Sequence, residues 1–289
     1  MSEKEIDEHT GIETTGHSWD GIKELNNPLP RWWLIIFWVS IIWSVVYWVL
    51  MPSWPGVTGH LKGVRNHSER ENVEVAMATL EEQRSEQMQR VLAVDNISEI
   101  ENDPDLLQYA MVAGESIFGD NCATCHGGGG QGFVGYPNLV DDDWIWGGSF
   151  DAIQQTLHYG IRSTHPQTRY NLMQAYGRDG LLTGDQIDDL VEYVISLSGG
   201  EADSAAVERA APVFAQQCTI CHGADGRGDQ AQGAPNLADA IWLYGGDRVS
   251  IQETIYQGRG GVMPPWTDRL SDEQIKALAI YVHSLGGGE

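Results

Sequence analysis

The chain has 289 residues, of which 42% are hydrophobic and 20% charged, a composition typical of folded rather than disordered proteins. At roughly 150 residues per domain, this length predicts two folded units with additional segments. The 17 Lys and Arg residues stand against 41 Asp and Glu residues, which gives a net charge of -24. Such a surface repels nucleic-acid phosphates and attracts basic proteins, so nucleic-acid binding is excluded. Whether the acidity serves a partner or only solubility stays open.

An apolar segment runs from Trp32 to Met51, interrupted only by two serines. Its length matches the roughly 20 residues that a helix needs to cross a bilayer, and tryptophans stand at its ends, where indole rings favour the headgroup layer. The sequence therefore predicts a transmembrane helix over residues 31–52, after an N-terminal tail of residues 1–30. A cleaved signal peptide is the alternative, but signal peptides begin with basic residues and have a shorter apolar stretch than this segment.

Residues 53–103 are predicted to be a linker that contains one long helix from Ser68 to Val94. Ser68 and Glu71 have the spacing of a capping box at its start. Apolar residues at helical spacing form a stripe along it: Val73, Met77, Leu80, Met88 and Val91. Because Arg84 interrupts the stripe, a helix that lies on the membrane or against a partner and a solvated linker helix are both consistent with the pattern.

An internal repeat occupies the chain after residue 105. The segment that begins at Cys122, Cys-Ala-Thr-Cys-His-Gly, returns at Cys218 as Cys-Thr-Ile-Cys-His-Gly. The segments that begin at Pro137, Trp144 and Ile153 return in the same order. Repetition of this kind indicates two tandem copies of one domain, for which we predict residues 104–200 and 201–289.

Both copies are predicted to be helical, which makes the chain all-α. Each closes with a capping box followed by apolar residues at helical spacing, Thr183 with Gln186 in the first copy and Ser271 with Gln274 in the second. A further helix is expected to begin at Asp103-Pro104. About 90 residues with long glycine-rich connections bury little apolar surface, so a buried cofactor is expected to complete each core.

The chain's four cysteines all belong to two Cys-x-x-Cys-His motifs, the pattern of c-type haem attachment. Two sulfurs one helical turn apart reach the two vinyl groups of a porphyrin, and the adjacent histidine reaches the iron. We predict two covalently bound haems c, held by Cys122 and Cys125 with His126, and by Cys218 and Cys221 with His222. Zinc and thiol-redox sites also use Cys-x-x-Cys, but a histidine directly after both pairs favours haem.

The sixth ligand of each iron is predicted to be a methionine. Met173 and Met263 lie at matching positions, each just before the closing helix of its copy. Histidine with methionine gives a closed iron of raised potential that is suited to electron transfer. A methionine that ligates the haem of its own copy is the natural arrangement, while exchange between two touching domains stays open.

Several other residues are expected near the haems. The carbonyls of Pro137 and Pro235 are predicted to accept the imidazole N–H of the ligating histidines. Arg162 and Arg259 are candidates for contact with haem propionates. Tryptophans at three positions are candidates for packing on the porphyrin or for ordinary core residues: Trp144, Trp146 and Trp242. Three further histidines are expected to be solvated or to cap helices, because the sequence offers no second ligand residue at metal-site spacing from them: His158, His165 and His283.

The stretch from Thr14 to Trp33, Thr-Thr-Gly-His-Ser-Trp-Asp-Gly-Ile-Lys-Glu-Leu-Asn-Asn-Pro-Leu-Pro-Arg-Trp-Trp, resembles the opening of the dihaem third subunit of cbb3-type cytochrome c oxidases. The order of anchor, linker helix and two cytochrome c domains is also similar to that family. The resemblance implies that electrons enter from a donor cytochrome c, cross two haems, and pass to the monohaem and catalytic subunits. It also implies location in a bacterial inner membrane.

Haem c is attached outside the cytoplasm, so the haem domains are expected in the periplasm and the N-terminus in the cytoplasm. No catalytic residue is predicted in this chain, because the complex rather than this subunit reduces oxygen. A dihaem peroxidase would need one iron with an open sixth position, which two matched methionines argue against. A free-standing, membrane-anchored dihaem shuttle is the nearer alternative.

Overall fold

The structure is a computed structural model that describes residues 5–286, and its chain divides into two units at Glu81 and Glu82. The first unit contains an antiparallel hairpin of β1, Thr14–Trp19, and β2, Ile22–Leu25. Asp20 and Gly21 form its turn, with φ angles of 49° and 86°. An Asp-Gly pair with positive φ at both positions gives the turn that suits a tight hairpin. The all-α prediction missed this hairpin, although that dipeptide signals it.

Helix α1, Arg31–Leu50, is long and apolar enough to cross a membrane, and none of its side chains is buried. Helix α2, Glu69–Ala93, follows and crosses the boundary between the two units. The Ser68 hydroxyl accepts a hydrogen bond of 3.3 Å from the main-chain N–H of Glu71 at the start of α2. Val73 and Met77 on the predicted stripe are exposed, and Val91 near the C-terminal end of the helix is buried.

The second unit contains two helical lobes, which we call the first lobe and the second lobe. The first lobe comprises α4 (Pro104–Asn121), α5 (Ala123–His126), α6 (Phe150–Tyr159) and α11 (Asp272–Ser284), with the short α3 (Ile97–Glu101) beside α4. The second lobe comprises α7 (Gly184–Leu197), α8 (Ser204–Gln217), α9 (Thr219–His222) and α10 (Arg248–Gln257). Together these elements form a mostly helical fold.

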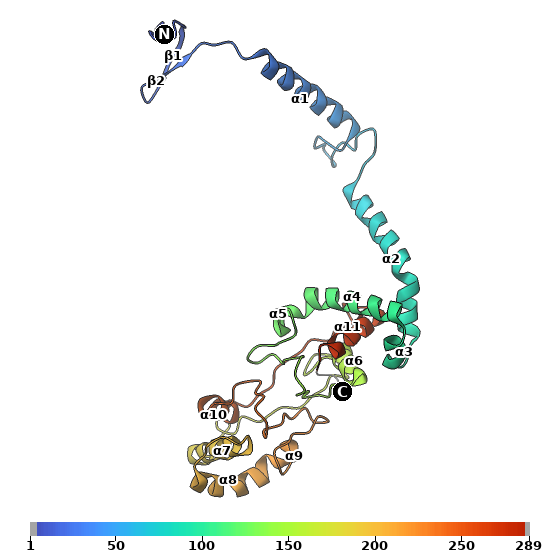
Figure 1. The fold of residues 1–289 in the computed structure, drawn as a ribbon, viewed down its shortest axis with the longest axis vertical. Helices are drawn as coiled ribbons and strands as arrows, with labels where there is room; N and C mark the ends of the chain where they lie inside the picture. The colour runs from blue at the N-terminus through green and yellow to red at the C-terminus, as the bar shows by residue number, and fades with distance from the viewer. Residues whose placement is uncertain (1–4, 287–289) are drawn as a thin grey trace. The chain divides into compact units, whose positions relative to one another are not determined.

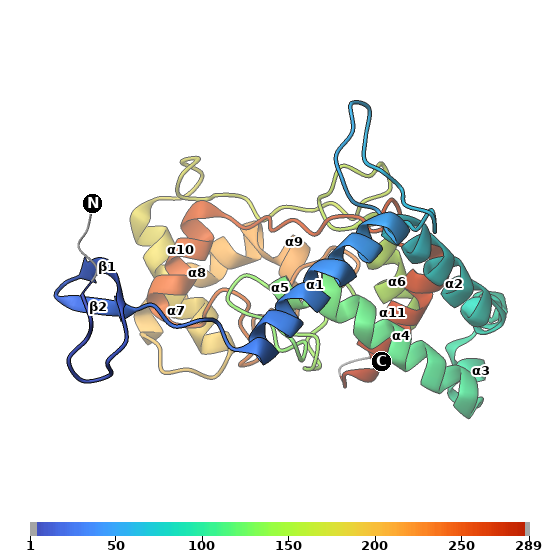
Figure 2. The same ribbon diagram turned by 90° about the horizontal axis from the view of Figure 1, so that it is seen from above.

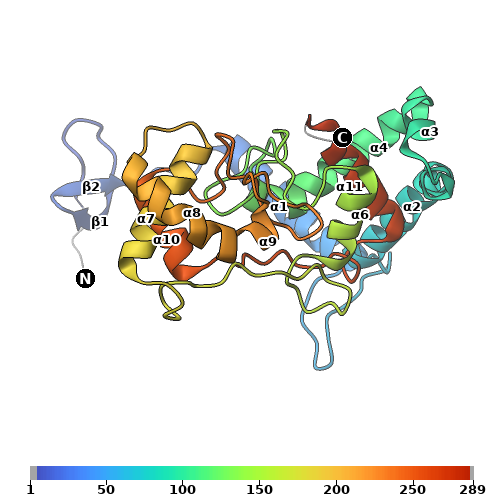
Figure 3. The same cartoon turned by 90° about the horizontal axis from the view of Figure 1, so that it is seen from below.

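The two sequence copies exchange their closing helices. Helix α7 closes the first copy in sequence but packs against α8 and α10 of the second copy. Helix α11 closes the second copy but packs against α4 and α6 of the first copy. Figures 1 and 3 show α11 beside α4 and α6, and α7 beside α8 and α10. Each lobe is therefore assembled from segments of both copies.

The connection between α7 and α8 explains the exchange. Helix α7 ends at Leu197 and α8 begins at Ser204, so a short loop joins them. Short loops between helices favour antiparallel packing of the two neighbours. Figure 2 gives a second view of these helices, again with α7 and α8 together. Because α7 packs against α8 in the second lobe, the core formed by α4 and α6 in the first lobe is covered by α11.

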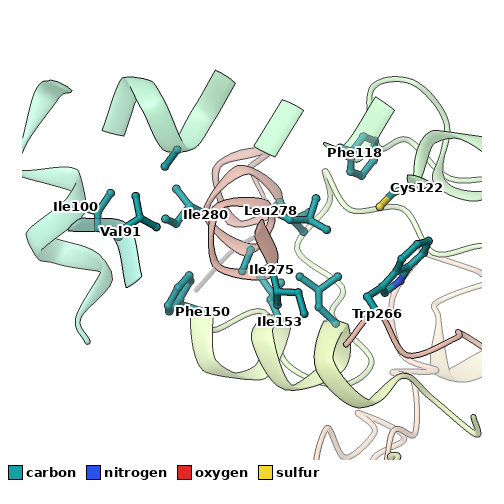
Figure 4. Close-up of a cluster of buried hydrophobic side chains, with 14 of the residues drawn as sticks. Val91, Ile100, Phe118, Cys122, Phe150, Ile153, Trp266, Ile275, Leu278 and Ile280 are labelled. Atoms are coloured by element: carbon teal, nitrogen blue, oxygen red, sulfur yellow. The ribbon is translucent and has the colours of Figure 1, made fainter. Parts of the chain in front are cut away.

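The core of the first lobe shows how tightly the exchanged helix fits (Figure 4). Phe118 of α4, Ile153 of α6 and Leu278 of α11 are all buried in one cluster. A Cβ atom on Gly114 of α4 would lie 2.5 Å from the carbonyl oxygen of Ala277 in α11. Such closeness requires glycine at this crossing, so α4 and α11 are close-packed partners.

The predicted N-terminal capping boxes of the two closing helices are confirmed. Thr183 with Gln186 and Ser271 with Gln274 both form reciprocal capping boxes. Asp103 caps α4 by accepting a hydrogen bond of 3.1 Å from the N–H of Leu106. These contacts satisfy main-chain donors that a helix N-terminus leaves unpaired.

Candidate functional site

The two Cys-x-x-Cys-His motifs form the short helices α5 and α9, which continue from the ends of α4 and α8. The Nδ1 atom of His126 donates to the Pro137 carbonyl at 2.9 Å, and that of His222 donates to the Pro235 carbonyl at 3.0 Å. Burial lowers the pKa of both imidazoles. Each ring is therefore held neutral with Nδ1 protonated, which leaves Nε2 free as a metal ligand.

The first cysteine of each motif is not set up as a reactive thiolate. Burial, together with the neighbouring Cys125, raises the pKa of the Cys122 thiol to about 11. The Cys218 thiol also has its pKa raised to about 11 by burial and by Cys221. Thiol-redox and metal-thiolate sites depend on lowered thiol pKa values. A thioether bond to a porphyrin, which needs no standing negative charge, suits this environment better.

The second lobe encloses a cavity of about 360 Å³ next to its motif. Cys218, Cys221 and His222 lie on its wall together with Met173. The rest of the lining is mainly apolar and includes Leu190, Val194, Phe214, Trp242, Ile251 and Ile255. An apolar cavity with a few polar groups at one side is the usual form of a small-molecule or cofactor site. Haem, with its apolar ring, fits this lining.

The first lobe holds two buried donors without an acceptor. Within residues 5–286, the indole Nε1 atoms of Trp144 and Trp266 are buried and have no hydrogen-bond partner. Both tryptophans pack in the core cluster that includes Cys122, and Figure 4 shows the Trp266 ring near that cysteine. Buried donors without acceptors are costly, so a bound group that carries acceptors is expected there. The carboxylates of haem supply such acceptors.

The structure places each candidate methionine in the lobe that holds the haem motif of the other copy. Met173 of the first copy lines the cavity beside His222. Met263 of the second copy packs in the first-lobe cluster with Cys122 and Trp266. This packing differs from the own-copy placement that the sequence suggested as natural. Each methionine lies in the same lobe as the closing helix that follows it in sequence, α7 after Met173 and α11 after Met263.

Arg162 and Arg259 do not serve one site each, because both line the second-lobe cavity. The side-chain contacts of Arg259 are matched in the first copy by those of Arg169 and not by those of Arg162. Arg259 donates to the Thr254 hydroxyl at 2.9 Å and lies over the Tyr244 ring at 4.2 Å. In the first copy, Arg169 makes the matching contacts: it donates to the Thr156 hydroxyl at 3.0 Å and lies over the Trp146 ring at 5.6 Å.

Sequence reasoning missed Arg169, although a signal for it exists. Arg169 and Arg259 each stand four residues before a candidate methionine. Burial lowers the pKa of Arg169, yet a guanidinium remains charged at neutral pH. Trp266 was also missed, and it occupies the place in the first lobe that Tyr176 holds in the second, three residues after each methionine.

The remaining histidines form no ligand cluster. In the part of the chain that the structure describes, no group of three or more His, Cys, Asp or Glu side chains is placed to hold a metal ion. His165 stacks on Tyr159, with ring centroids 4.8 Å apart, and the His158 ring lies tilted to the same tyrosine at 5.8 Å. These contacts give the two side chains packing roles.

Comparison with known proteins agrees with this geometry. The family model described as "N-terminal domain of cytochrome oxidase-cbb3, FixP" matches residues 11–58. A second model, "Cytochrome C oxidase, cbb3-type, subunit III", matches residues 110–194 and again residues 205–282. The chain belongs to the family of cbb3-type cytochrome c oxidase subunit III. Its match to the second model in two places agrees with the internal repeat.

Curated relatives of this subunit III family extend over nearly the whole chain. The protein named Cbb3-type cytochrome c oxidase subunit FixP from Bradyrhizobium sp. (strain ORS 278) is 51% identical over 289 residues, covering 99% of this chain and 98% of the relative. The subunit named CcoP from Cereibacter sphaeroides is 49% identical over 277 residues, covering 96% of this chain and 95% of the relative. Membership in this cytochrome c family implies covalently bound haem c, and the site residues described above fit that group.

Proposed function

We propose that this chain carries two haems c and passes electrons from a donor cytochrome c toward the oxygen-reducing subunit of a cbb3-type oxidase. The observation that carries the proposal is the pair of motifs whose histidines donate Nδ1–H to proline carbonyls at 2.9 and 3.0 Å, which leaves Nε2 free as a ligand. Haem iron between imidazole and thioether supplies reversible one-electron chemistry. Cys122 and Cys125, with Cys218 and Cys221, would hold the two porphyrins.

The role proposed for the chain is transfer, not oxygen chemistry. Met173 and Met263 each lie in the same lobe as one histidine of the motifs, so an imidazole and a thioether of this chain would hold each iron. A closed iron offers oxygen or peroxide no coordination site. The oxygen chemistry is assigned to the catalytic subunit, with the monohaem subunit as the next carrier.

Helix α1 is proposed as a single-pass anchor in the bacterial inner membrane. Covalent haem attachment on the outer side would place the second unit in the periplasm and the tail before Arg31 in the cytoplasm. The net charge of -24 favours a basic donor cytochrome c, whose encounter rate would fall as salt screens the attraction. The names of the relatives favour a subunit of a complex over a free-standing shuttle.

Gentle extraction tests this proposal. A tagged full-length chain is purified from membranes in mild detergent, and its companions and haem content are identified by mass spectrometry. We expect the catalytic and monohaem subunits to travel with it, and the denatured chain to carry two haem additions. A chain that is isolated alone with two haems would support the shuttle, and fewer than two additions would contradict the proposed site.

A further inference from the structure

The loop between α1 and α2, residues 51–68, is fixed to the C-terminal end of α1. The N–H of Val64 donates to the Val49 carbonyl at 2.9 Å. The N–H of Arg65 donates to the Leu50 carbonyl at 3.1 Å. These bonds pair carbonyls that the end of a helix otherwise leaves without a partner. The α1–α2 loop therefore returns to the level at which the apolar helix ends (Figure 1).

Two further features hold the α1–α2 loop in this position. Gly63 has a φ of 70°, and a Cβ atom on it would lie 2.5 Å from the Leu50 carbonyl oxygen. Only glycine allows this close approach in this conformation. Near the start of the loop, the Trp54 ring meets the Trp48 ring of α1 edge-on, with centroids 5.0 Å apart. Both ends of the loop are thus held against α1, and the loop stays at the helix end.

The middle of the α1–α2 loop is a narrow turn that carries exposed apolar side chains. The N–H of Ser53 donates to the Leu61 carbonyl at 3.0 Å, and the N–H of Leu61 donates to the Trp54 carbonyl at 2.9 Å. Val57 at the tip is fully exposed, and Leu61 and Val64 are 60% and 77% exposed. Apolar side chains beside a membrane-spanning helix are favourably buried at the boundary between headgroups and acyl chains.

The same part of the chain is the exception to its acidic character. Residues 25–68 contain no Asp or Glu, although the whole chain has 41. They contain three basic residues, Arg31 at the start of α1 and Lys62 and Arg65 in the loop. Both loop cations are exposed, and no ion pair among residues 5–286 includes either of them. Positive charge and exposed apolar side chains together are what an anionic membrane surface attracts.

We propose that the α1–α2 loop docks on anionic phospholipid headgroups. Lys62 and Arg65 lie against the lipid phosphates, and Val57 and Leu61 enter the acyl boundary. The docking rests on the anchoring of the chain by α1, which brings the loop to the bilayer surface, and it requires no particular orientation of the chain across the membrane. Because α2 begins directly after the loop, at Glu69, the docked loop gives that helix a fixed start at the membrane surface.

Amide hydrogen exchange in lipid nanodiscs of two compositions tests the docking. The full-length, haem-loaded chain is placed in discs of phosphatidylcholine alone, or of equal parts of phosphatidylcholine and phosphatidylglycerol. Mass spectrometry follows exchange in the peptides that cover Val57 and Thr58 at the tip. We expect exchange there to be about 30-fold slower in the anionic discs, the factor that corresponds to about 2 kcal/mol from two cations near an anionic surface. Added salt should reduce this difference.

Matched pairs of substitutions identify the residues responsible. Lys62→Gln combined with Arg65→Gln should abolish the difference between the two disc compositions. The control combines Arg70→Gln with Arg84→Gln, which removes the same charge from exposed positions of α2 and should leave the difference unchanged. Val57→Asp should weaken the protection in the anionic discs, because a carboxylate at the tip is repelled by the lipid phosphates.

The other outcomes separate the docking from the proposed function. Equal exchange of the unaltered chain in both disc compositions would overturn the docking while leaving the haems and the electron transfer intact. Protection that appears only when the catalytic and monohaem subunits are present, in either composition, would assign the loop to a protein partner and overturn docking on lipid. Failure of the chain to enter the discs would overturn both the docking and the anchoring by α1.

Discussion

Truncation of one buried leucine in each closing helix tests the helix exchange without reference to the haems. Leu278 of α11 and Leu190 of α7 hold equivalent places in the repeat, and they are 0% and 1% exposed. Replacing a fully buried leucine by alanine costs about 2 to 5 kcal/mol through lost burial and a residual cavity. Because 1.4 kcal/mol corresponds to a tenfold change in an equilibrium, even the lower figure should increase local opening about 30-fold.

The exchange determines where that opening appears. Leu278→Ala should accelerate amide hydrogen exchange in α4 and α6, although α11 belongs to the other sequence copy. Leu190→Ala should act in the same way on α8 and α10. The measurement is hydrogen exchange with mass spectrometry on the extracted, haem-loaded protein, with the exposed Leu181 replaced by alanine as the control. Faster exchange in α8 and α10 after Leu278→Ala would refute the packing described here.

Three further predictions concern single contacts. Gly160→Ala should lower the thermal midpoint of unfolding more than the control Gly180→Ala. The two glycines have nearly equal φ angles, 67° and 69°, but of the two only Gly160 would bring a Cβ atom against a carbonyl oxygen. Equal effects would mean that the contact with this carbonyl does not matter. Lys276→Met should cost about 1 to 3 kcal/mol and speed amide exchange at the end of α2, since the Lys276 ammonium donates to the Leu92 carbonyl at 3.0 Å; unchanged exchange there would contradict it. Burial and two nearby carboxylates raise the pKa of Asp143 to about 6 from an ordinary 3.8, so the folded state binds more protons and stability should fall as pH rises from about 4 to 6. Asp143→Asn should remove this pH dependence of thermal unfolding and, after solvent screening, raise the free energy of unfolding above pH 6 by about 1 kcal/mol. An unchanged pH dependence would contradict the raised pKa of Asp143.

Local sequence patterns predicted the helices and the histidine contacts well. The capping boxes at Thr183 and Ser271 were visible as spacings because both partners lie within one helical turn. The proline carbonyls that accept from His126 and His222 were also anticipated, since both prolines follow their motifs at similar distances in the repeat. Interactions between residues that are close in the sequence can therefore be predicted from the spacing of those residues.

The partner of each closing helix was not predictable in the same way. Helices α7 and α11 carry equivalent apolar residues, so each one suits the core of either lobe. Their pattern shows which face is buried but not which copy covers it. The short loop between Leu197 and Ser204 was the available signal, because it ties α7 to α8. The placement of Met173 and Met263 follows from that loop and not from their own surroundings in sequence.

The place of this chain in electron transfer is tested most directly by removing it. Membranes from cells with and without the chain are supplied with a reduced basic cytochrome c, and the rates of cytochrome c oxidation and oxygen consumption are measured over a range of salt concentrations. We expect oxidation through the cbb3-type oxidase to be lost without the chain, and the rate with the chain to fall as salt rises. Oxidation at the normal rate and with equal salt dependence in membranes that lack the chain would contradict its role as the entry subunit.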